Sequence, residues 1–268
     1  MPDPKAISDA LVGWFKQSAR DLPWRIRPLG TLRDPYAVLV SEIMLQQTQV
    51  SRVVERFTAF TRAFPTVHDL AVADEDEVLS LWSGMGYYQR ARRLRAAAAV
   101  VAESGVWPST AANLHALPGV GPYTAGAIAS LAFGQRTPVV DGNVARVLLR
   151  LHGRDGTLNE AATMKWAWTQ AASLVEGADH PAGIINEALM ELGATLCTPC
   201  SPSCPTCPLG ACLGRAAKRV HEIPSPRKQA AKSKLYCASL LARAAQNRLL
   251  IEQRTAGGMW ASLWQAPT

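Results

Sequence analysis

Apolar residues recur at helical spacing through most of residues 1–220, so this region is predicted to be mainly α-helical. In segment 6–19, Ile7, Leu11, Trp14 and Phe15 share one helical stripe. Two helices are expected within 36–60, and another begins near 73–76, where acidic residues favour the positive end of a helix dipole. Further helices are expected over residues 90–102, 125–133, 143–151, 160–175 and 184–196.

The pattern changes after residue 222. Segment 223–234 is basic and contains Pro and Ser, which is typical of a flexible linker. Segments 235–242 and 248–253 predict two strands, Gly257 and Gly258 predict a turn, and the end of the chain, 260–268, is expected to have no partner. The 34 residues of 235–268 are too few for an independent domain. We therefore expect one folded domain over 1–222, a linker over 223–234 and an incomplete segment over 235–268.

Composition and charge narrow the class of protein. Hydrophobic residues make up 48% and charged residues 18%, as in ordinary globular proteins. No apolar run reaches the roughly 20 residues of a membrane span, and the N-terminus lacks the layout of a signal peptide. A monomeric, cytoplasmic protein is therefore expected, with no membrane partner. The formal charge of +7 suits a nucleic acid partner, although many basic proteins bind none.

Five of the six cysteines lie between Cys197 and Cys212. In a cytosolic chain such a cluster indicates a metal site before it indicates disulfides. One alternative is zinc, held by Cys197 and Cys200 as one pair and by Cys204 and Cys207 as the other. Zinc ribbons separate their two pairs by a long excursion, whereas only three residues lie between these pairs. An iron–sulfur cluster is therefore favoured.

The string 117–123 contains Gly119-Val120-Gly121 between two expected helices. Glycines let the backbone approach a phosphate closely, and the following helix presents its N-terminal N–H groups to that anion. Leu117 and Val120 would anchor this turn in the core. The alternative is an ordinary turn between two helices.

Two acidic residues are candidates for catalysis. On a helix, Glu42 shares a face with Val38 and Leu45, so its carboxyl enters apolar surroundings and its pKa should rise. It could then hold a proton near neutral pH and act as a general acid. A half-buried Glu paired with Arg is the alternative. Asp141 lies in the string 139–143 before a helix, where either Asp141 or Asn143 could simply cap that helix.

Taken together, the strings 117–123, 139–143 and 41–49 and the cysteine loop resemble the helix-hairpin-helix, iron–sulfur DNA glycosylases, and the MutY-type adenine DNA glycosylases best of all. The resemblance implies two helical subdomains, one of six helices at about 30–133, the other made of the N-terminal helix and about 134–222. It implies a [4Fe–4S] cluster on Cys197, Cys204, Cys207 and Cys212. The family's spacing is C-x6-C-x2-C-x5-C; here the last interval is one residue shorter, and Cys200 is an extra thiol.

The resemblance also implies roles for individual residues. Asp141 would stabilise an oxocarbenium-like centre at C1′ of the sugar, Asn143 would position the sugar or water, and Glu42 would protonate a ring nitrogen of the leaving adenine. Gln47 and Tyr87 lie where the family has intercalating or duplex-facing residues; the alternative is that either is an ordinary surface or core side chain. Gly119, Val120 and Gly121 would hold a DNA phosphate. The adenine pocket would be lined by an exposed wall of Leu22, Trp24 and Arg25, by Glu187 and by Arg20.

Position 123 separates two activities within this superfamily. Bifunctional relatives that excise oxidised pyrimidines have a lysine there, whose amine attacks C1′. Tyr123 cannot form a Schiff base, so the expected activity is monofunctional excision of adenine mispaired with 8-oxoguanine or guanine in double-stranded DNA. The alternatives are a bifunctional endonuclease III-like enzyme and a non-catalytic DNA-binding protein.

The segments 249–254 and 258–260 resemble the opening strands of the family's Nudix-like α+β domain. Because the chain stops at Thr268, that domain is expected to be truncated, and recognition of 8-oxoguanine stays open.

Overall fold

The computed structural model describes residues 3–26, 28–226, 238–255 and 264–268. The chain divides into two compact units, Met1–Arg227 and Lys228–Thr268, and each is considered by itself.

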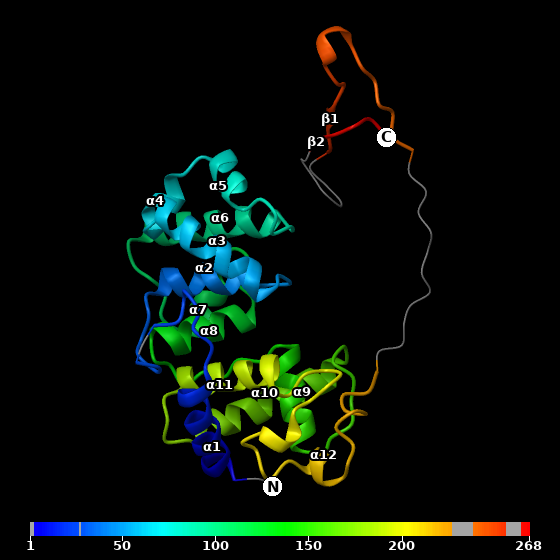
Figure 1. The fold of residues 1–268 in the computed structure, drawn as a ribbon. Coiled ribbons are helices and arrows are strands. Elements are labelled where there is room, and N and C mark those ends of the chain that lie inside the picture. Colours follow the sequence, from blue (N-terminus) through cyan, green and yellow to red (C-terminus); the bar gives the residue numbers. More distant parts are fainter. Residues whose placement is uncertain (1–2, 27, 227–237, 256–263) are drawn as a thin grey trace. The chain divides into compact units, whose positions relative to one another are not determined.

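The first unit is built almost entirely from helices, as predicted (Figure 1). Their bounds are α1 Pro4–Ser18, α2 Pro35–Leu45, α3 Val50–Ala63, α4 Val67–Val72, α5 Glu75–Leu81, α6 Gln89–Ser104, α7 Ala111–His115, α8 Pro122–Ala132, α9 Gly142–Leu151, α10 Ala161–Glu176, α11 Ala182–Thr195, η1 Cys204–Thr206 and α12 Leu213–Ala216.

Local sequence chemistry explains where several of these helices begin. Asp34 and Asp74 each accept backbone N–H groups at the start of α2 and α5, and a Pro follows Asp34 at the first helical position. Thr66 and Asp69 form a reciprocal capping box at the start of α4. Helix α4 was not predicted because it is only six residues long and shows less than two turns of periodicity.

One hydrophobic core lies among helices α2 to α8. Helices α2 and α8 are buried on nearly every side, as expected of helices that are apolar all round. Trp82 is completely buried and meets the ring of Phe60 edge-on at 6.1 Å between centroids.

A second core joins α1 to α9, α10 and α11. The N-terminal helix therefore packs against helices that follow it by more than 120 residues, and Figure 1 shows α1 beside the later helices. The segment between α1 and α2 passes from the second core to the first, and this crossing places Arg20 and Arg33 beside α11.

Among its described residues, 238–255 and 264–268, the second unit has one small antiparallel pair of strands. Strand β1, Glu252–Gln253, pairs with β2, Trp264–Gln265, with Glu252 opposite Gln265. A 3-10 turn, η2 Ala245–Asn247, and a single bridge between Arg243 and Leu249 precede it.

The strand predictions for this unit were largely wrong. Residues 238–242, the described part of the first predicted strand, form no strand, and the second predicted strand shrinks to β1. The end of the chain does have a partner, because Trp264–Gln265 pairs with β1. Strand formation depends on a partner at the right distance, which an apolar pattern alone does not specify. Residues 235–237 and the predicted turn at Gly257 and Gly258 lie outside the described residues.

In the part of the chain that the structure describes, no helix has both the length and the apolar character needed to cross a membrane.

Candidate active site

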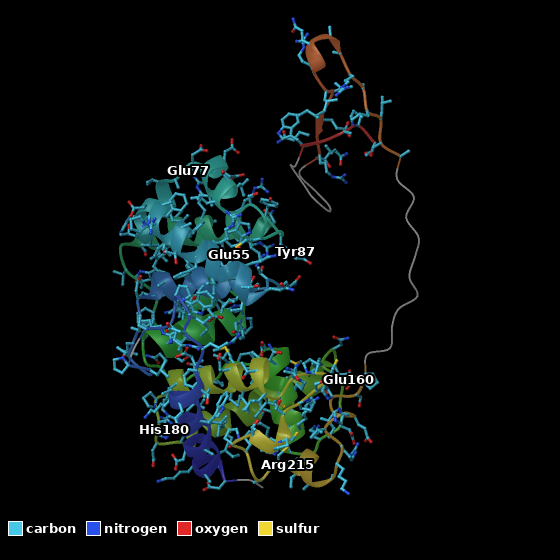
Figure 2. All side chains as sticks on the ribbon, viewed as in Figure 1. Glu55, Glu77, Tyr87, Glu160, His180 and Arg215 are labelled. Carbon is cyan, nitrogen blue, oxygen red and sulfur yellow. The ribbon has the colours of Figure 1, made fainter. Side chains whose placement is uncertain are left out.

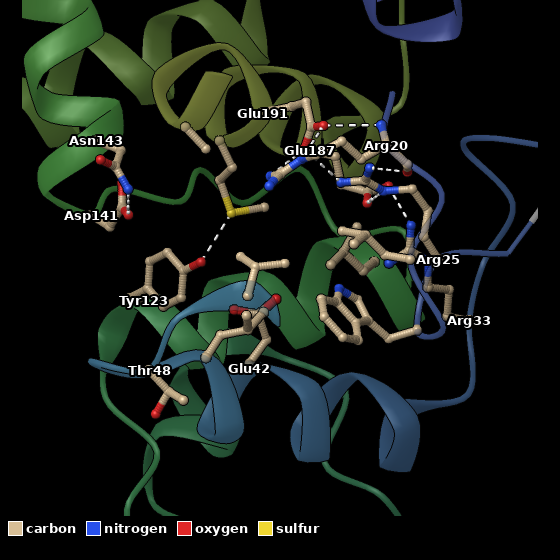
Figure 3. A pocket seen from close by; sticks show the side chains of 17 residues that line it. Arg20, Arg25, Arg33, Glu42, Thr48, Tyr123, Asp141, Asn143, Glu187 and Glu191 are labelled. Atoms are coloured by element: carbon tan, nitrogen blue, oxygen red, sulfur yellow. Dashed lines mark hydrogen bonds and ion pairs between the residues drawn. The ribbon is translucent and has the colours of Figure 1, made fainter. Parts of the chain in front are cut away.

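One cavity of about 220 Å³ in the first unit gathers side chains from α2, α8, α9, α11 and the segment before α2 (Figure 3). All nine residues predicted for catalysis or for the base pocket line it: Arg20, Leu22, Trp24, Arg25, Glu42, Tyr123, Asp141, Asn143 and Glu187. Glu42 and Asp141 therefore face the same space, although 99 residues separate them in the chain.

Glu42 lies on α2 and is only 6% exposed. Burial raises the pKa of its carboxyl to about 7, partly offset by the nearby Tyr123 hydroxyl. Its Oε2 is buried and has no hydrogen-bond partner among the described residues. The predicted rise in pKa is confirmed, and Glu42 forms no ion pair among these residues, so the alternative of a Glu paired with Arg does not hold.

Asp141 is the N-cap of α9, which confirms the structural interpretation of this residue. Its Oδ1 accepts the Val144 backbone N–H at 2.7 Å, and its Oδ2 accepts Asn143 Nδ2 at 3.0 Å. The carboxylate also lines the cavity. Capping and a role in the cavity are thus compatible, because the cap holds the carboxylate in one orientation at the cavity wall.

Tyr123 comes from the first turn of α8 and lies between the two acidic side chains in the view of Figure 3. Its hydroxyl donates to Met190 Sδ at 3.0 Å. Burial, and then the nearby charges of Glu42 and Asp141, raise the pKa of the phenol well above its usual value. Tyr123 is therefore neutral and offers no amine to a sugar carbon.

The opposite end of the cavity is a chain of alternating charges (Figure 3). Arg20 holds Glu191 through Nε at 2.7 Å and Nη2 at 3.0 Å. Arg25 bridges the two glutamates, donating to Glu187 at 3.1 Å and to Glu191 at 3.2 Å. Arg33 then donates to Glu187 Oε2 at 2.5 Å. This network anchors the segment before α2 to α11, and removing one member would leave a buried charge unpaired.

Two features of this wall differ from the prediction. Trp24 was expected to be exposed, but it is 7% exposed and packs edge-on against Phe57 at 5.6 Å. Arg25 is also buried, with a side-chain exposure of 7%. The prediction failed because the segment folds back over the first core. Arg33 and Glu191 were missed; two glutamates four residues apart, at positions 187 and 191 of the mostly apolar α11, were the available signal.

A hydrogen-bonded chain leads from the cavity toward the cysteine loop. Asn143, which donates to Asp141, accepts Arg146 Nη2 at 2.9 Å. Arg146 Nε in turn donates to the Cys197 carbonyl at 2.9 Å. The side chains of Asp141, Asn143 and Arg146 thus form a continuous hydrogen-bonded link between the cavity and the start of the cysteine loop.

Four thiols, those of Cys197, Cys204, Cys207 and Cys212, line a second, apolar pocket of about 20 Å³. Cys200 is exposed outside this pocket, so the zinc arrangement that needs it does not fit. Among the described residues no three Cys, His, Asp or Glu side chains lie close enough to share a single metal ion.

A buried arginine lies beside one of these thiols. Arg150 is almost completely buried, and its Nη1 lies 3.4 Å from Cys197 Sγ. Burial raises the pKa of Cys207 and of Cys212, so these thiols need a cationic partner to ionise.

The hairpin between α7 and α8 has the predicted anchors, because Leu117 and Val120 are buried. Gly119 has φ +75°, and a Cβ there would lie 2.7 Å from Arg93 Cβ, so the turn requires glycine. Gly121 is the N-cap of α8. The other two predicted DNA-facing residues, Gln47 and Tyr87, are exposed, and Tyr87 projects outward in Figure 2.

Comparisons with known proteins agree with this architecture. Residues 40–171 match the model of the HhH-GPD superfamily of base excision DNA repair proteins. The chain is 30% identical to a thermostable thymine-DNA glycosylase, with a TM-score of 0.69 over 80% of this chain and 97% of that one. An endonuclease III in a non-covalent DNA complex shares the fold, with 23% identity and a TM-score of 0.62 over 79% of this chain and 94% of that one.

Curated relatives narrow the family further. The human adenine DNA glycosylase is 50% identical over 200 residues, which cover 72% of this chain but 36% of the human protein, so the chain spans little more than a third of that relative. The adenine DNA glycosylase of Mycobacterium tuberculosis (strain ATCC 25618 / H37Rv) is 40% identical over 218 residues, covering 80% of this chain and 69% of that protein. From the fold, the helix-hairpin-helix match and these relatives, the chain belongs to the MutY-type adenine DNA glycosylases of the helix-hairpin-helix superfamily.

Proposed function

We propose that this chain is a monofunctional DNA glycosylase that removes adenine mispaired with 8-oxoguanine or guanine in double-stranded DNA. The observation that carries the proposal is the shared cavity, where a buried glutamate with a pKa of about 7 and the capped carboxylate of Asp141 line one space. Its volume of about 220 Å³ is below the roughly 300–1,000 Å³ of pockets for drug-sized ligands, which suits a single base.

In this proposal the two carboxyl groups divide the reaction between them. Glu42, protonated near neutral pH, gives its proton to a ring nitrogen of adenine, and the electron pair of the glycosidic bond leaves with the base. Asp141 stabilises the positive charge that develops at C1′. Asn143 helps to position the sugar or the water that then adds to C1′, which leaves an abasic site.

The ion-pair network at one end of the cavity offers hydrogen-bond acceptors to a purine that carries an exocyclic amine. Glu187 accepts hydrogen bonds from Arg25 and Arg33, and its oxygens could also receive N–H groups of adenine. Leu22 and the buried Trp24 supply apolar surface beside it. Arg20 contributes further donors at the same wall.

The DNA duplex is proposed to lie against the hairpin and two exposed loops. Gly119, Val120 and Gly121 would hold a phosphate at the start of α8, and Gln47 and Tyr87 would enter the stack beside the extruded adenine. A [4Fe–4S] cluster would be held by Cys197, Cys204, Cys207 and Cys212, the four thiols that line one pocket, and would supply a rigid anchor for the loop that contains them.

The test is a single-turnover assay with protein in excess over duplexes that carry adenine opposite 8-oxoguanine, guanine or thymine, and over a duplex with thymine glycol. We expect adenine release from the first two, and strand breaks only after treatment with hot alkali, because Tyr123 offers no amine for strand cleavage. Strand scission without alkali, or processing of thymine glycol in preference to adenine, would favour the endonuclease III-like alternative. Undetectable adenine release would refute the proposal.

A further inference from the structure

Arg90, at the start of α6, has a guanidinium that contacts many backbone and side-chain oxygens outside its own helix. Its two terminal nitrogens face six oxygen acceptors, which lie at the end of α2, in the turn that follows it and in the loop before α6. Nη1 donates to the carbonyls of Ile43 (3.0 Å) and Met44 (3.1 Å) and to that of Gln46. These three carbonyls belong to the end of α2, the helix that carries Glu42.

The other terminal nitrogen of Arg90 extends the contact to the second loop. Nη2 donates to Thr48 Oγ1 at 2.9 Å, and to the carbonyls of Met85 at 3.0 Å and Gly86 at 3.2 Å. The guanidinium also lies over the rings of Tyr87 and Trp82, at 5.5 and 5.4 Å from their centroids. A single planar group thus fastens turn 46–49 to loop 84–88.

These two loops hold unusual backbone conformations at exposed positions. Gln47 has φ +54° and Tyr87 has φ +47°, which lie in the left-handed region that residues other than glycine rarely adopt. Both side chains are exposed, and Tyr87 retains 64% of its accessible surface. A strained backbone conformation persists only where surrounding contacts hold it in place. The Arg90 guanidinium donates to the carbonyl of Gln46, directly before Gln47, and to that of Gly86, directly before Tyr87.

We infer that Arg90 is a positioning residue for base extrusion, whose guanidinium holds Gln47 and Tyr87 together as one rigid wedge at the end of the helix that carries Glu42. This inference rests on the proposed function. Arg90 itself is half-buried beneath the loops, so it acts through Gln47 and Tyr87 without touching the substrate. A flexible pair of loops would have to be ordered each time a base leaves the stack, and the fixed guanidinium removes that cost.

The test is a double-mutant cycle of Arg90→Lys and Gln47→Ala, read as single-turnover adenine excision with protein in excess over the duplex. Lysine keeps the charge but replaces the planar fork by one ammonium, which cannot serve both loops. We expect Arg90→Lys to slow excision roughly 10- to 100-fold, the effect of losing one or two hydrogen bonds to a charged group. Because Arg90 acts through Gln47, the double variant should be no more than about threefold slower than the slower single variant.

A matched control is Arg92→Lys on the same helix, whose guanidinium forms one ion pair with Glu75 at 2.8 Å and leaves both loops untouched. Its rate should stay within about twofold of the wild type, as for an ordinary surface substitution. Single-turnover rate constants do not depend on the folded fraction while folded protein exceeds the duplex, so reduced stability of Arg90→Lys does not mimic the effect.

A second readout follows extrusion directly. With 2-aminopurine in place of the target adenine and Asp141→Asn to block excision, the rise in fluorescence at saturating protein should be smaller when Arg90→Lys is added. An unchanged rise, or losses that multiply in the double variant, would overturn the inference. If the wild type releases no adenine, the proposed function itself fails and the inference fails with it, whereas multiplicative losses in an active enzyme refute only the role of Arg90.

Discussion

Replacing Glu42 by Gln keeps the size of a buried side chain but removes its ability to ionise. This change should raise the stability of the protein at high pH relative to the wild type and reduce its excision activity. In the wild type, the pKa of Glu42 rises from 4.5 to about 7 on folding. The folded state thus holds a proton that the unfolded chain releases. The associated stability is fully present below pH 4.5 and is lost as the pH rises through about 7.

The size of the effect follows from the two pKa values. Between pH 5 and pH 8, a group with pKa 4.5 unfolded and about 7 folded loses about 2.5 kcal/mol of its contribution to the free energy of unfolding, at ~1.36 kcal/mol per pKa unit. Gln at position 42 has no such dependence. The difference in unfolding free energy between Glu42→Gln and the wild type should therefore shift by about 2.5 kcal/mol in favour of the variant from pH 5 to pH 8.

Urea unfolding of both proteins at pH 5 and pH 8, followed by far-UV circular dichroism, measures this shift. Any constant effect of burying an amide cancels, because only the change between the two pH values is compared. Excision by the variant should fall about 10²- to 10⁴-fold at every pH, the usual contribution of a general acid. A stability difference that is equal at pH 5 and pH 8 would show that the Glu42 carboxyl is not held protonated by burial, and would remove the reason to name it the acid.

Three further outcomes follow from the same geometry. Wild-type excision should fall about tenfold per pH unit above pH 7, because Glu42 loses its proton there; a rate that rises with pH over this range would contradict the acid role. Asp141→Asn should keep the cap on α9 and so change the free energy of unfolding by less than about 0.5 kcal/mol, yet reduce excision by roughly 10³-fold or more with little loss of duplex affinity; undiminished excision would exclude the proposed mechanism. Cys204→Ser should abolish the yellow-brown colour of an iron–sulfur cluster, whereas Cys200→Ser, at an exposed thiol outside the pocket, should keep it. Visible spectra and iron analysis measure this, and a colourless wild-type protein that contains zinc would refute the cluster assignment.

Local pattern was sufficient for most of the helical architecture, for the burial of Glu42 and for the cap at Asp141. The apolar neighbours of Glu42 at positions 38 and 45 predicted its burial, because side chains three and four residues apart share a helix face. The position of Asp141 directly before a helix likewise predicted a cap, and Asp141 is the N-cap of α9. Both depend on residues close together in the chain, so the sequence alone determined them.

The tertiary structure decided what depends on contacts between distant segments. The ion-pair chain through Arg33 and Glu191, the burial of Trp24 and the clamp formed by Arg90 all arise where a loop folds back onto a helix. The pairing of Glu252–Gln253 with Trp264–Gln265 is of the same kind. Periodicity and caps report a residue's immediate neighbours, whereas the direction of a long arginine side chain is set by acceptors that only the packed fold brings within reach.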